Sequence, residues 1–307
     1  MDKLKFKNFI EITKPISEKM EKIMNKKLSP FSVLKIIFSS PIPFFKKIIY
    51  LIPSKIFIFK KREDLIFKHR LKKFCEVTEY IFNNQKYQKI PFFQITKNEN
   101  LEFFSRIVNF SMIILKDQYL VNQFIKKNDI VIDAGANIGL FSLFASFKGA
   151  KVFAFEPVFE TYRCLLENIK YFKAEKDIFS FCLALGETKK ESLIKVNPSS
   201  SVQSTIIDSN YFSIEKFILK KVNIITIDEF LKENKIKKLN FIKIDTEGYE
   251  LKILKGAKET IQKLKPKIAV SAYHKKEDKK EIPKFILRIR PDYQYKLINK
   301  GEEVFIF

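Results

Sequence analysis

From Asp129 to the C-terminus, short apolar runs alternate with stretches in which apolar residues recur at helical spacing. Runs with the length of buried strands lie at 130–133, 151–156, 178–185, 239–245 and 267–272. The stretches between them predict helices at 139–147, 159–172, Ile227–Glu233, 251–264 and 277–289. Such alternation is typical of a largely parallel sheet covered by helices on both faces. We therefore expect an α/β fold, and a hairpin at 293–298 and 303–307 would make the sheet mixed.

Weaker patterns complete the expected organisation. Residues 193–196 and 222–225 are candidate strands, and the polar stretch 197–210 is a candidate loop. A helix is expected at 116–126, directly before the first strand. Residues 1–75 predict short helices separated at prolines. We expect a basic, mainly helical N-terminal extension at 1–115 and the α/β domain at 116–307.

The chain is strongly basic, and its charge is uneven. It has 58 Lys and Arg against 35 Asp and Glu, a net charge of +23, and residues 1–75 hold 19 of the basic and 6 of the acidic residues. A basic surface attracts polyanions such as nucleic acid, anionic lipid head groups or acidic glycans. The alternative is a solvated lysine surface that reflects an AT-rich coding sequence, and both interpretations stay open at this point.

The most apolar part of the extension, 31–59, does not predict a transmembrane helix. Its longest uncharged run, 36–45, is shorter than the roughly 20 residues that span a bilayer, and several prolines interrupt the segment. One interpretation is an interfacial segment that contacts an anionic membrane through residues 31–75. The other is a helical appendage packed on the main domain. The first 24 residues lack the apolar core of a secretory signal, so we expect a cytoplasmic protein, peripheral at the inner membrane surface under the first interpretation.

Cysteine and histidine are too few and too scattered to predict a metal centre. The three cysteines, Cys75, Cys164 and Cys182, form no C-x-x-C pair, and the two histidines are His69 and His274. Reduced thiols in a cytosolic protein are the favoured interpretation. We expect no bound metal.

After the first predicted strand, the pattern D-x-G-x-N-x-G is formed by Asp133, Gly135, Asn137 and Gly139. The first glycine lets backbone approach a ligand closely, and the second lets the start of the helix pack against the strand. A dinucleotide-binding turn would need G-x-G-x-x-G and a P-loop would need Gly-Lys-Ser/Thr, and neither spacing is present here. The pattern instead resembles the first motif of class I methyltransferases.

Glu156 ends the second predicted strand, 21 positions after Gly135. Ligands of parallel sheets bind at the carboxyl ends of the strands, and a carboxylate there can accept two hydrogen bonds from a ribose diol. An ordinary surface glutamate at a strand end is the alternative. By the same argument, Ala184 and Leu185 at the end of the third predicted strand would line an adenine pocket.

Two acids, Asp245 and Glu247, follow the fourth predicted strand. A carboxylate pair there can orient a hydroxyl acceptor and take its proton during methyl transfer. Alternatively, these acids cap the helix that begins near Gly248. Lys243, inside the apolar strand, is either an ion-pair partner of one acid or an edge residue. His274 follows the next strand and is expected at the rim near the cofactor, as a base or a ligand of an acceptor oxygen, with an exposed loop histidine as the alternative.

These stretches resemble the FkbM-type methyltransferases. The matching segments are VIDAGANIGLFSL, FAFEPVFETYRCLLENI, LALGE, TIDEFLKE and FIKIDTEGYELKILKGAKETIQKLKPKIAVSAYHKKEDKKEIP. The resemblance implies a Rossmann-like class I methyltransferase fold with a mostly parallel seven-stranded sheet, S-adenosylmethionine as methyl donor, and a small-molecule or glycan acceptor methylated at oxygen. The residues that match the family's cofactor motifs are Asp133, Gly135, Asn137, Gly139 and Glu156, and those that match its acid–glycine motif are Asp245, Glu247 and Gly248. Where many members carry an acid, this chain has Ser271 and Ala272.

Three functions follow as hypotheses. The first is an O-methyltransferase that acts on a sugar, a glycolipid or a related small molecule. The second is a nucleic-acid methyltransferase, which the basic charge favours but which two carboxylates at the fourth strand end oppose, because they would repel a phosphate backbone. The third is a non-catalytic membrane-surface or assembly protein that retains the fold. Binding of S-adenosylmethionine separates the third hypothesis from the first two.

Overall fold

The computed structural model describes residues 1–25, 100–197, 204–206, 217–300 and 302–307. Contacts within the chain define two compact units, one formed by Met1–Glu11 with Val108–Phe307 and the other by Ile12–Ile107. The division at residue 115 into an extension and a catalytic domain stays a prediction. The segment predicted to contact a membrane, 31–75, lies outside the described residues. Among the helices that are described, none has the length and apolar character needed to cross a bilayer.

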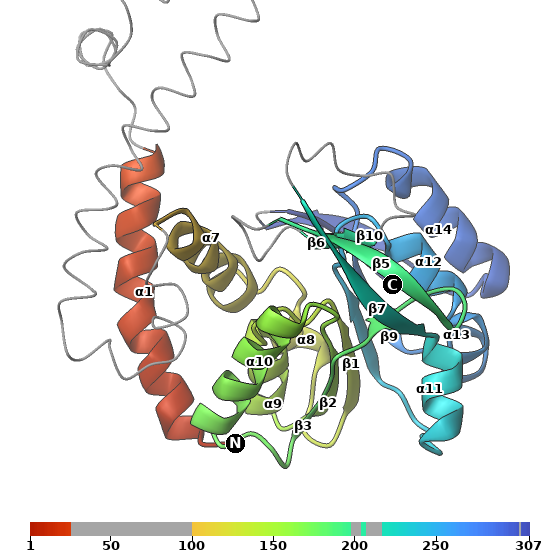
Figure 1. Ribbon diagram of the computed structural model, residues 1–307, viewed down its shortest axis with the longest axis horizontal. Helices are drawn as coiled ribbons and strands as arrows, with labels where there is room; N and C mark the ends of the chain where they lie inside the picture. The colour runs from red at the N-terminus through yellow and green to blue at the C-terminus, as the bar shows by residue number, and fades with distance from the viewer. Residues whose placement is uncertain (26–99, 198–203, 207–216, 301) are drawn as a thin grey trace, which may run out of the picture. The chain divides into compact units, whose positions relative to one another are not determined.

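The larger sheet has seven strands in the order β10-β11-β9-β8-β1-β2-β3 (Figure 1). Their bounds are β1 (Ile130–Ala134), β2 (Lys151–Phe155), β3 (Ile178–Phe181), β8 (Phe241–Ile244), β9 (Lys267–Ser271), β10 (Lys296–Asn299) and β11 (Glu303–Ile306). Strands β9, β8, β1, β2 and β3 are parallel, and β11 is antiparallel to both β9 and β10. The predicted mixed sheet with a C-terminal hairpin is confirmed. The chain order reverses beside β1, and ligands of such sheets bind at this switch point.

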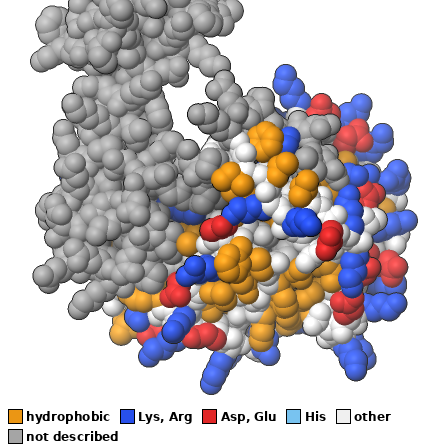
Figure 2. All heavy atoms as spheres, in the orientation of Figure 1, with side chains coloured by type: hydrophobic (Ala, Val, Ile, Leu, Met, Phe, Trp, Pro, Cys, Tyr) orange, Lys and Arg blue, Asp and Glu red, His pale blue; other side chains and the backbone are white. Residues whose placement is uncertain are grey.

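Predicted helices cover the sheet. They are α9 (Leu140–Phe147), α10 (Phe159–Tyr171), α11 (Ile227–Glu233) and α14 (Asp278–Ile289). All four residues of β8 are buried, as expected for a central parallel strand covered on both faces. On the face drawn in Figure 2, the Lys and Arg side chains of the described residues are interspersed with acidic ones. The positive charge therefore forms no single patch on this described face.

The single helix predicted at 251–264 is wrong. Two helices replace it, α12 (Glu250–Lys255) and α13 (Lys258–Leu264). At the break, the carbonyl of Gly256 accepts a hydrogen bond from the N–H of Asp228 at 3.0 Å. The Asp228 carboxylate accepts from the N–H groups of Glu259 and Thr260 at 2.9 and 2.8 Å, so it caps α13. The break depends on a partner from a distant segment, which the helical spacing does not reveal.

The helix predicted at 116–126 is also wrong. A helix at α7 (Asn100–Phe110) continues into a π-helical turn at Ser111–Leu115, and only α8 (Val121–Phe124) is helical within the predicted range. Asp117 and Leu120 have φ of 51° and 54°, a backbone conformation that interrupts a right-handed helix. The Asp117 carboxylate instead accepts hydrogen bonds from the N–H groups of the first two residues of α8, at 2.6 and 3.0 Å.

Prolines were expected to separate short helices in 1–75, but α1 (Lys3–Asn25) runs through Pro15 without a break. The backbone hydrogen bond lost at proline is offset by the burial of one face of the helix. Buried positions on that face include Phe6, Phe9, Thr13, Ile16 and Met20. The other helices predicted in 1–75 lie outside the described residues.

A second sheet, with strand order β4-β7-β5-β6, was not predicted. Its strands are β4 (Ala184–Leu185), β5 (Lys190–Val196), β6 (Ser204–Ile206) and β7 (Ile218–Ile225). The apolar run at 178–185 was expected to be one strand, but β3 pairs with β2 whereas β4 pairs with β7. In the stretch 197–210, residues 204–206 are not loop, because β6 pairs with β5. The rest of that stretch beyond Asn197 lies outside the described residues.

Candidate active site

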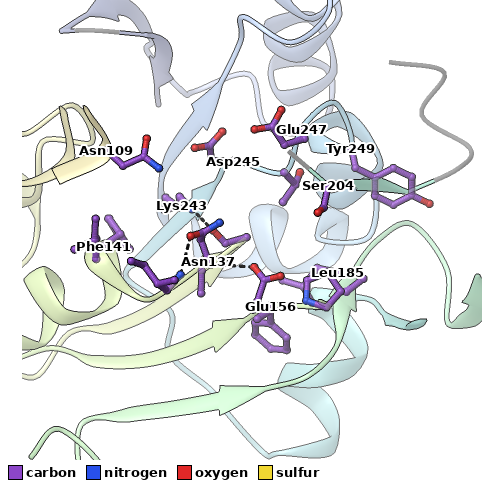
Figure 3. A pocket seen from close by; sticks show the side chains of 18 of the residues that line it. Asn109, Asn137, Phe141, Glu156, Leu185, Ser204, Lys243, Asp245, Glu247 and Tyr249 are labelled. Atoms are coloured by element: carbon purple, nitrogen blue, oxygen red, sulfur yellow. Dashed lines mark hydrogen bonds between the residues drawn. The ribbon is translucent and has the colours of Figure 1, made fainter. Parts of the chain in front are cut away.

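A cavity of about 360 Å³ lies at the carboxyl ends of β1, β2 and β8, with parts of the second sheet as one wall (Figure 3). This volume is in the range of small-molecule sites. The predicted site residues that line it are Gly135, Asn137, Glu156, Ala184, Leu185, Asp245 and Glu247. The predicted site residues outside its lining are Asp133, Gly139 and His274. The strand-end argument therefore located the cavity, although three of the predicted residues lie outside its lining.

The two glycines of the D-x-G-x-N-x-G turn have different surroundings. Gly135 has φ of +75°, and a Cβ there would lie 2.0 Å from the carbonyl oxygen of Asp245. Its N–H donates to the carbonyl of Phe155 at 3.1 Å, so the turn is fixed between β2 and β8. Gly139 has φ of +92°, and a Cβ there would lie 2.5 Å from Leu165 Cδ1. Gly139 therefore permits α9 to pack on α10 and does not line the cavity.

Glu156 is buried at the end of β2 and lines the cavity. Its Oε2 accepts a hydrogen bond from the N–H of Asn137 at 2.9 Å, and its Oε1 accepts from the N–H of Val158 at 3.0 Å. These bonds fix the carboxylate, and because a carboxylate can accept about four hydrogen bonds, the same group can also bind a ligand diol. The glycine turn and the strand-end acid thus meet in one cavity, as the sequence predicted.

Asp133 and Lys243 form a buried ion pair behind the turn. Lys243 Nζ lies 3.1 Å from Asp133 Oδ1, and the side chains are 4% and 0% exposed. Asp133 also accepts a hydrogen bond from Ser142 Oγ at 2.6 Å, and Lys243 donates to the carbonyl of Gly135 at 2.7 Å. The partner predicted for Lys243 among the acids after β8 is corrected to Asp133. The pair connects the two central strands and holds the turn from below.

Asp245 is held by two tyrosine hydroxyls. Tyr119 donates to its Oδ2 at 2.7 Å, and Tyr273 donates to its Oδ1 at 3.3 Å. Burial by itself would raise the pKa of Asp245, but the positive charges of Lys243 and His274 and the Tyr119 hydrogen bond outweigh it, and the pKa lies below its ordinary value. Asp245 is therefore ionised at neutral pH.

Glu247 lines the cavity from a left-handed backbone position, with φ of 56°. Its carbonyl accepts a hydrogen bond from Thr205 Oγ1 of β6 at 2.7 Å, which anchors this unusual conformation. Burial raises the pKa of Glu247 to about 8; repulsion from Asp245 adds to this effect and His274 opposes it. A carboxyl group with a pKa near the working pH is matched to proton transfer.

His274 was expected at the rim of the site, but its side chain is fully buried behind Asp245 and Glu247. Its Nδ1 lies 2.9 Å from Glu250 Oε1, and its Nε2 lies 3.7 Å from Asp245 Oδ1 and 3.5 Å from Glu247 Oε2. Burial would lower the pKa of His274, but Glu250 and then the two acids outweigh it and raise the pKa to about 9. The sequence did not predict Glu250 as part of this group.

A family model described as the methyltransferase FkbM domain matches residues 133–297, more than half of the chain. The chain belongs to the FkbM methyltransferase family. The predicted family, enzyme class and methyl donor, S-adenosylmethionine, are thereby confirmed.

Two relatives and one solved structure that are similar to this chain carry the name methyltransferase. Hexuronic acid methyltransferase AglP of Haloferax volcanii is 28% identical over 181 residues, which cover 59% of this chain and 71% of that protein. Methyltransferase sdnD of Sordaria araneosa is 24% identical over 204 residues, which cover 58% and 74%. The crystal structure of methyltransferase FkbM from Methylobacillus flagellatus is 21% identical, with a TM-score of 0.46, over 72% of this chain and 58% of that chain. The last match therefore spans less than two thirds of the solved chain.

Several polar side chains that line the cavity of this chain were not predicted from the sequence. They include Asn109, Gln118, Tyr273 and Glu302. Burial, with repulsion from Asp245, raises the pKa of Glu302 to about 7. These residues come from segments before β1, after β9 and between β10 and β11, and no motif spacing connects them to the glycine turn. Only tertiary packing brings them to the site.

Within the described part of the chain, Asp245, Glu250 and His274 offer atoms within 4.8 Å of one another, a spacing that a metal ion could use. In the structure the two carboxylates face different nitrogens of the imidazole, Asp245 the Nε2 at 3.7 Å and Glu250 the Nδ1 at 2.9 Å. Glu250 Oε1 also accepts a hydrogen bond from the N–H of Thr246 at 2.9 Å.

The raised pKa of Glu247 predicts a pH-dependent stability. The pKa is about 8 in the fold against an ordinary 4.5, so the folded state favours the protonated form. The stability of the fold relative to the unfolded chain is therefore undiminished by Glu247 below pH 4.5, and it is lost progressively as the pH rises from there through about 8. Between pH 4.5 and pH 9, Glu247→Gln should therefore gain unfolding free energy relative to wild type, on the order of 5 kcal/mol for the full shift, measured by urea denaturation. The exposed Glu259→Gln should show no such change, and identical pH dependence in wild type and Glu247→Gln would contradict the assignment.

Proposed function

We propose that this FkbM-family methyltransferase binds S-adenosylmethionine in the 360 Å³ cavity and methylates a hydroxyl oxygen of a sugar or related small molecule. The observation that carries the proposal is the 2.9 Å hydrogen bond between the Asn137 N–H and Glu156, which joins the glycine turn to the strand-end acid. Across the same cavity lie Asp245 and Glu247 (Figure 3). The same cavity would therefore hold the cofactor near Glu156 and the proton-accepting carboxylates on its opposite side.

The cofactor end of the cavity is formed by Glu156 and apolar side chains. Glu156 would accept hydrogen bonds from the ribose hydroxyls, since its carboxylate is fixed by two backbone N–H groups. Apolar residues of this end include Leu183, Ala184, Leu185, Ile194 and Ile206. They would bury the adenine ring and exclude water from it.

The acceptor end is formed by Asp245, Glu247 and neighbouring polar groups. S-adenosylmethionine supplies an electrophilic methyl group on a sulfonium. Asp245, ionised and fixed by Tyr119, would orient the acceptor hydroxyl. With the donor bound, the acceptor oxygen would bond to the methyl carbon as the carbon–sulfur bond breaks with its electron pair on sulfur, and ionised Glu247 would take the hydroxyl proton. Glu247 is the better matched base, because its pKa is about 8 whereas that of Asp245 is lowered.

A sugar acceptor is supported by the chemistry of this end and by one relative. Asn109, Gln118 and Tyr273 line it with amide and hydroxyl groups that suit the hydroxyls of a polyol. The relative from Haloferax volcanii is named a hexuronic acid methyltransferase. Transfer of labelled methyl groups to a panel of hexoses, amino sugars and hexuronic acids, with products located by mass spectrometry, tests the acceptor class and the methylated atom.

Glu156→Gln is expected to weaken S-adenosylmethionine binding roughly 10- to 100-fold, on the order of 1.5–3 kcal/mol, because hydrogen bonds to a charged acceptor are lost. Isothermal titration calorimetry measures the change. Glu259→Gln, an exposed change on α13, is the control and should bind as wild type does. Absence of binding to the wild-type protein would refute the proposed function, whereas equal binding by wild type and Glu156→Gln would refute only the role of Glu156.

A further inference from the structure

Glu250 is a buried acid that was not among the predicted site residues and that does not line the cavity. It is the first residue of α12, and its side chain is 0% exposed. Its Oε1 accepts hydrogen bonds from the N–H groups of Thr246 and Gly248, at 2.9 and 3.3 Å. The same oxygen lies 2.9 Å from His274 Nδ1. Glu250 thus fixes both the turn that carries the cavity acids and the imidazole behind them.

The imidazole of His274 lies between one inner carboxylate and two carboxylates of the cavity wall. Its Nδ1 faces Glu250, and its Nε2 faces Asp245 and Glu247 at 3.7 and 3.5 Å. A ring that is hydrogen-bonded to a carboxylate through one nitrogen presents its other nitrogen in a fixed direction. Since all three neighbours are acids, the arrangement favours a ring that donates from both nitrogens.

We propose that Glu250 is a positioning residue that holds His274 as a buried imidazolium, whose Nε2–H faces Asp245 and Glu247 and favours their ionised forms for proton acceptance. The proposal rests on the proposed function, because the pair accepts a proton only in methyl transfer to a hydroxyl. Glu250 and His274 touch neither the cofactor nor the acceptor; they act through Glu247. The hydroxyl proton ends on Glu247, and His274 keeps both of its protons.

The charges around His274 support a permanently protonated ring. Acidic groups face it from the turn after β8, from α12, from α14 and from the turn between β10 and β11; they are Asp245, Glu247, Glu250, Asp278 and Glu302. Burial would lower the pKa of His274, but the Glu250 hydrogen bond and charge, followed by Asp245 and Glu247, raise it to about 9. In return, His274 is a charge that lowers the pKa of Glu247 and of Asp245.

The test uses nuclear magnetic resonance of the histidine rings in the full chain, which needs no acceptor. The chain has two histidines, so a His69→Gln variant assigns the His274 signals. In the wild-type protein, the ¹⁵N shifts at pH 7.5 should show both nitrogens of His274 protonated, with a pKa close to 9. A neutral ring at pH 7.5, or an ordinary pKa near 6.5, would overturn the proposal without any variant.

Glu250→Gln then tests the positioning role, because it removes the charge and keeps the shape and the acceptor oxygen. The pKa of His274 should fall by roughly one unit or more. Glu259→Gln on α13 is the matched control and should leave the His274 signals unchanged. An unchanged pKa in folded Glu250→Gln would refute the role of Glu250.

Activity gives the second readout. Turnover should rise with pH as Glu247 ionises. In His274→Gln the cation is lost and Glu247 ionises less readily, so the midpoint of this rise should move to higher pH by about one unit. A purely structural role would lower turnover at every pH without moving the profile, and that result would overturn the proposal. If the resonances behave as expected but S-adenosylmethionine does not bind, the ion pair stands and the proposed function fails. If methyl transfer occurs with a neutral His274, the proposed function stands and this inference fails.

Discussion

Replacing Lys243 with methionine is expected to lower the free energy of unfolding by about 3–5 kcal/mol. The ammonium lies 3.1 Å from Asp133 Oδ1, and both side chains are buried, at 4% and 0% exposed. Methionine matches the length of the lysine stem but leaves the Asp133 carboxylate in the interior without its counter-ion. Urea denaturation at pH 7 measures the change.

Two further variants decide whether the ion pair is the cause. Lys265→Met breaks a pair with Asp292 whose side chains are 41% and 53% exposed, so its expected cost is below about 1 kcal/mol. Adding Asp133→Asn to Lys243→Met removes the uncompensated charge and should restore most of the lost stability. A loss for Lys243→Met no greater than for Lys265→Met, or no recovery in the double variant, would contradict the assignment.

The same double variant separates folding from cofactor binding. Lys243 also donates to the carbonyl of Gly135 at 2.7 Å, and methionine cannot replace that bond. The double variant should therefore be nearly as stable as wild type yet bind S-adenosylmethionine more weakly, because the turn is less firmly held. The lysine within β8 thus has two roles, one in the sheet and one in the shape of the cavity.

Sequence patterns predicted the features of this site that depend on single strands and the turns directly after them. Gly135, Glu156 and Asp245 each follow a buried apolar run, and the carboxyl ends of neighbouring parallel strands share an edge. Their meeting in one cavity therefore needed only the strand–helix alternation and the order of the strands. The helices at α11 and α14 were predictable for the same reason, because their apolar periodicity is local.

Features that depend on distant partners were not predictable. Tyr119 lies in a segment expected to be helical, but Asp117 and Leu120 near it have positive φ, and in this non-helical segment its hydroxyl donates to Asp245. His274 was expected at the rim, but burial by α12 and α14 depends on how these helices pack. Glu250 and His274 follow the neighbouring parallel strands β8 and β9, but the sequence pattern does not indicate that the carboxylate of one would face the imidazole of the other.

Glu247→Gln is expected to reduce turnover by roughly 10²- to 10⁴-fold, because the glutamine amide cannot accept the proton of the acceptor hydroxyl. In the wild-type enzyme, turnover should rise as the pH passes through about 8, where Glu247 ionises. In the variant, the residual rate should not follow this rise. Single-turnover transfer of labelled methyl groups to the acceptor found in the sugar panel measures both effects, and calorimetry should show nearly unchanged S-adenosylmethionine binding.

Glu259→Gln, exposed on α13, should retain the wild-type rate and its pH profile. A Glu247→Gln enzyme with more than about a tenth of the wild-type turnover and an unshifted profile would place the base elsewhere, with Asp245 as the next group to replace.

The loss of turnover and the gain in stability expected for Glu247→Gln have one physical origin. Burial and the neighbouring Asp245 make the ionised carboxylate costly for the fold, and they also raise its pKa to about 8, the range in which it can take up a proton during turnover. Glutamine removes both the unfavourable buried charge and the group that accepts the proton. A variant that is more stable at pH 9 but inactive would show that Glu247 is kept at the expense of folding, as expected for a residue with a catalytic role.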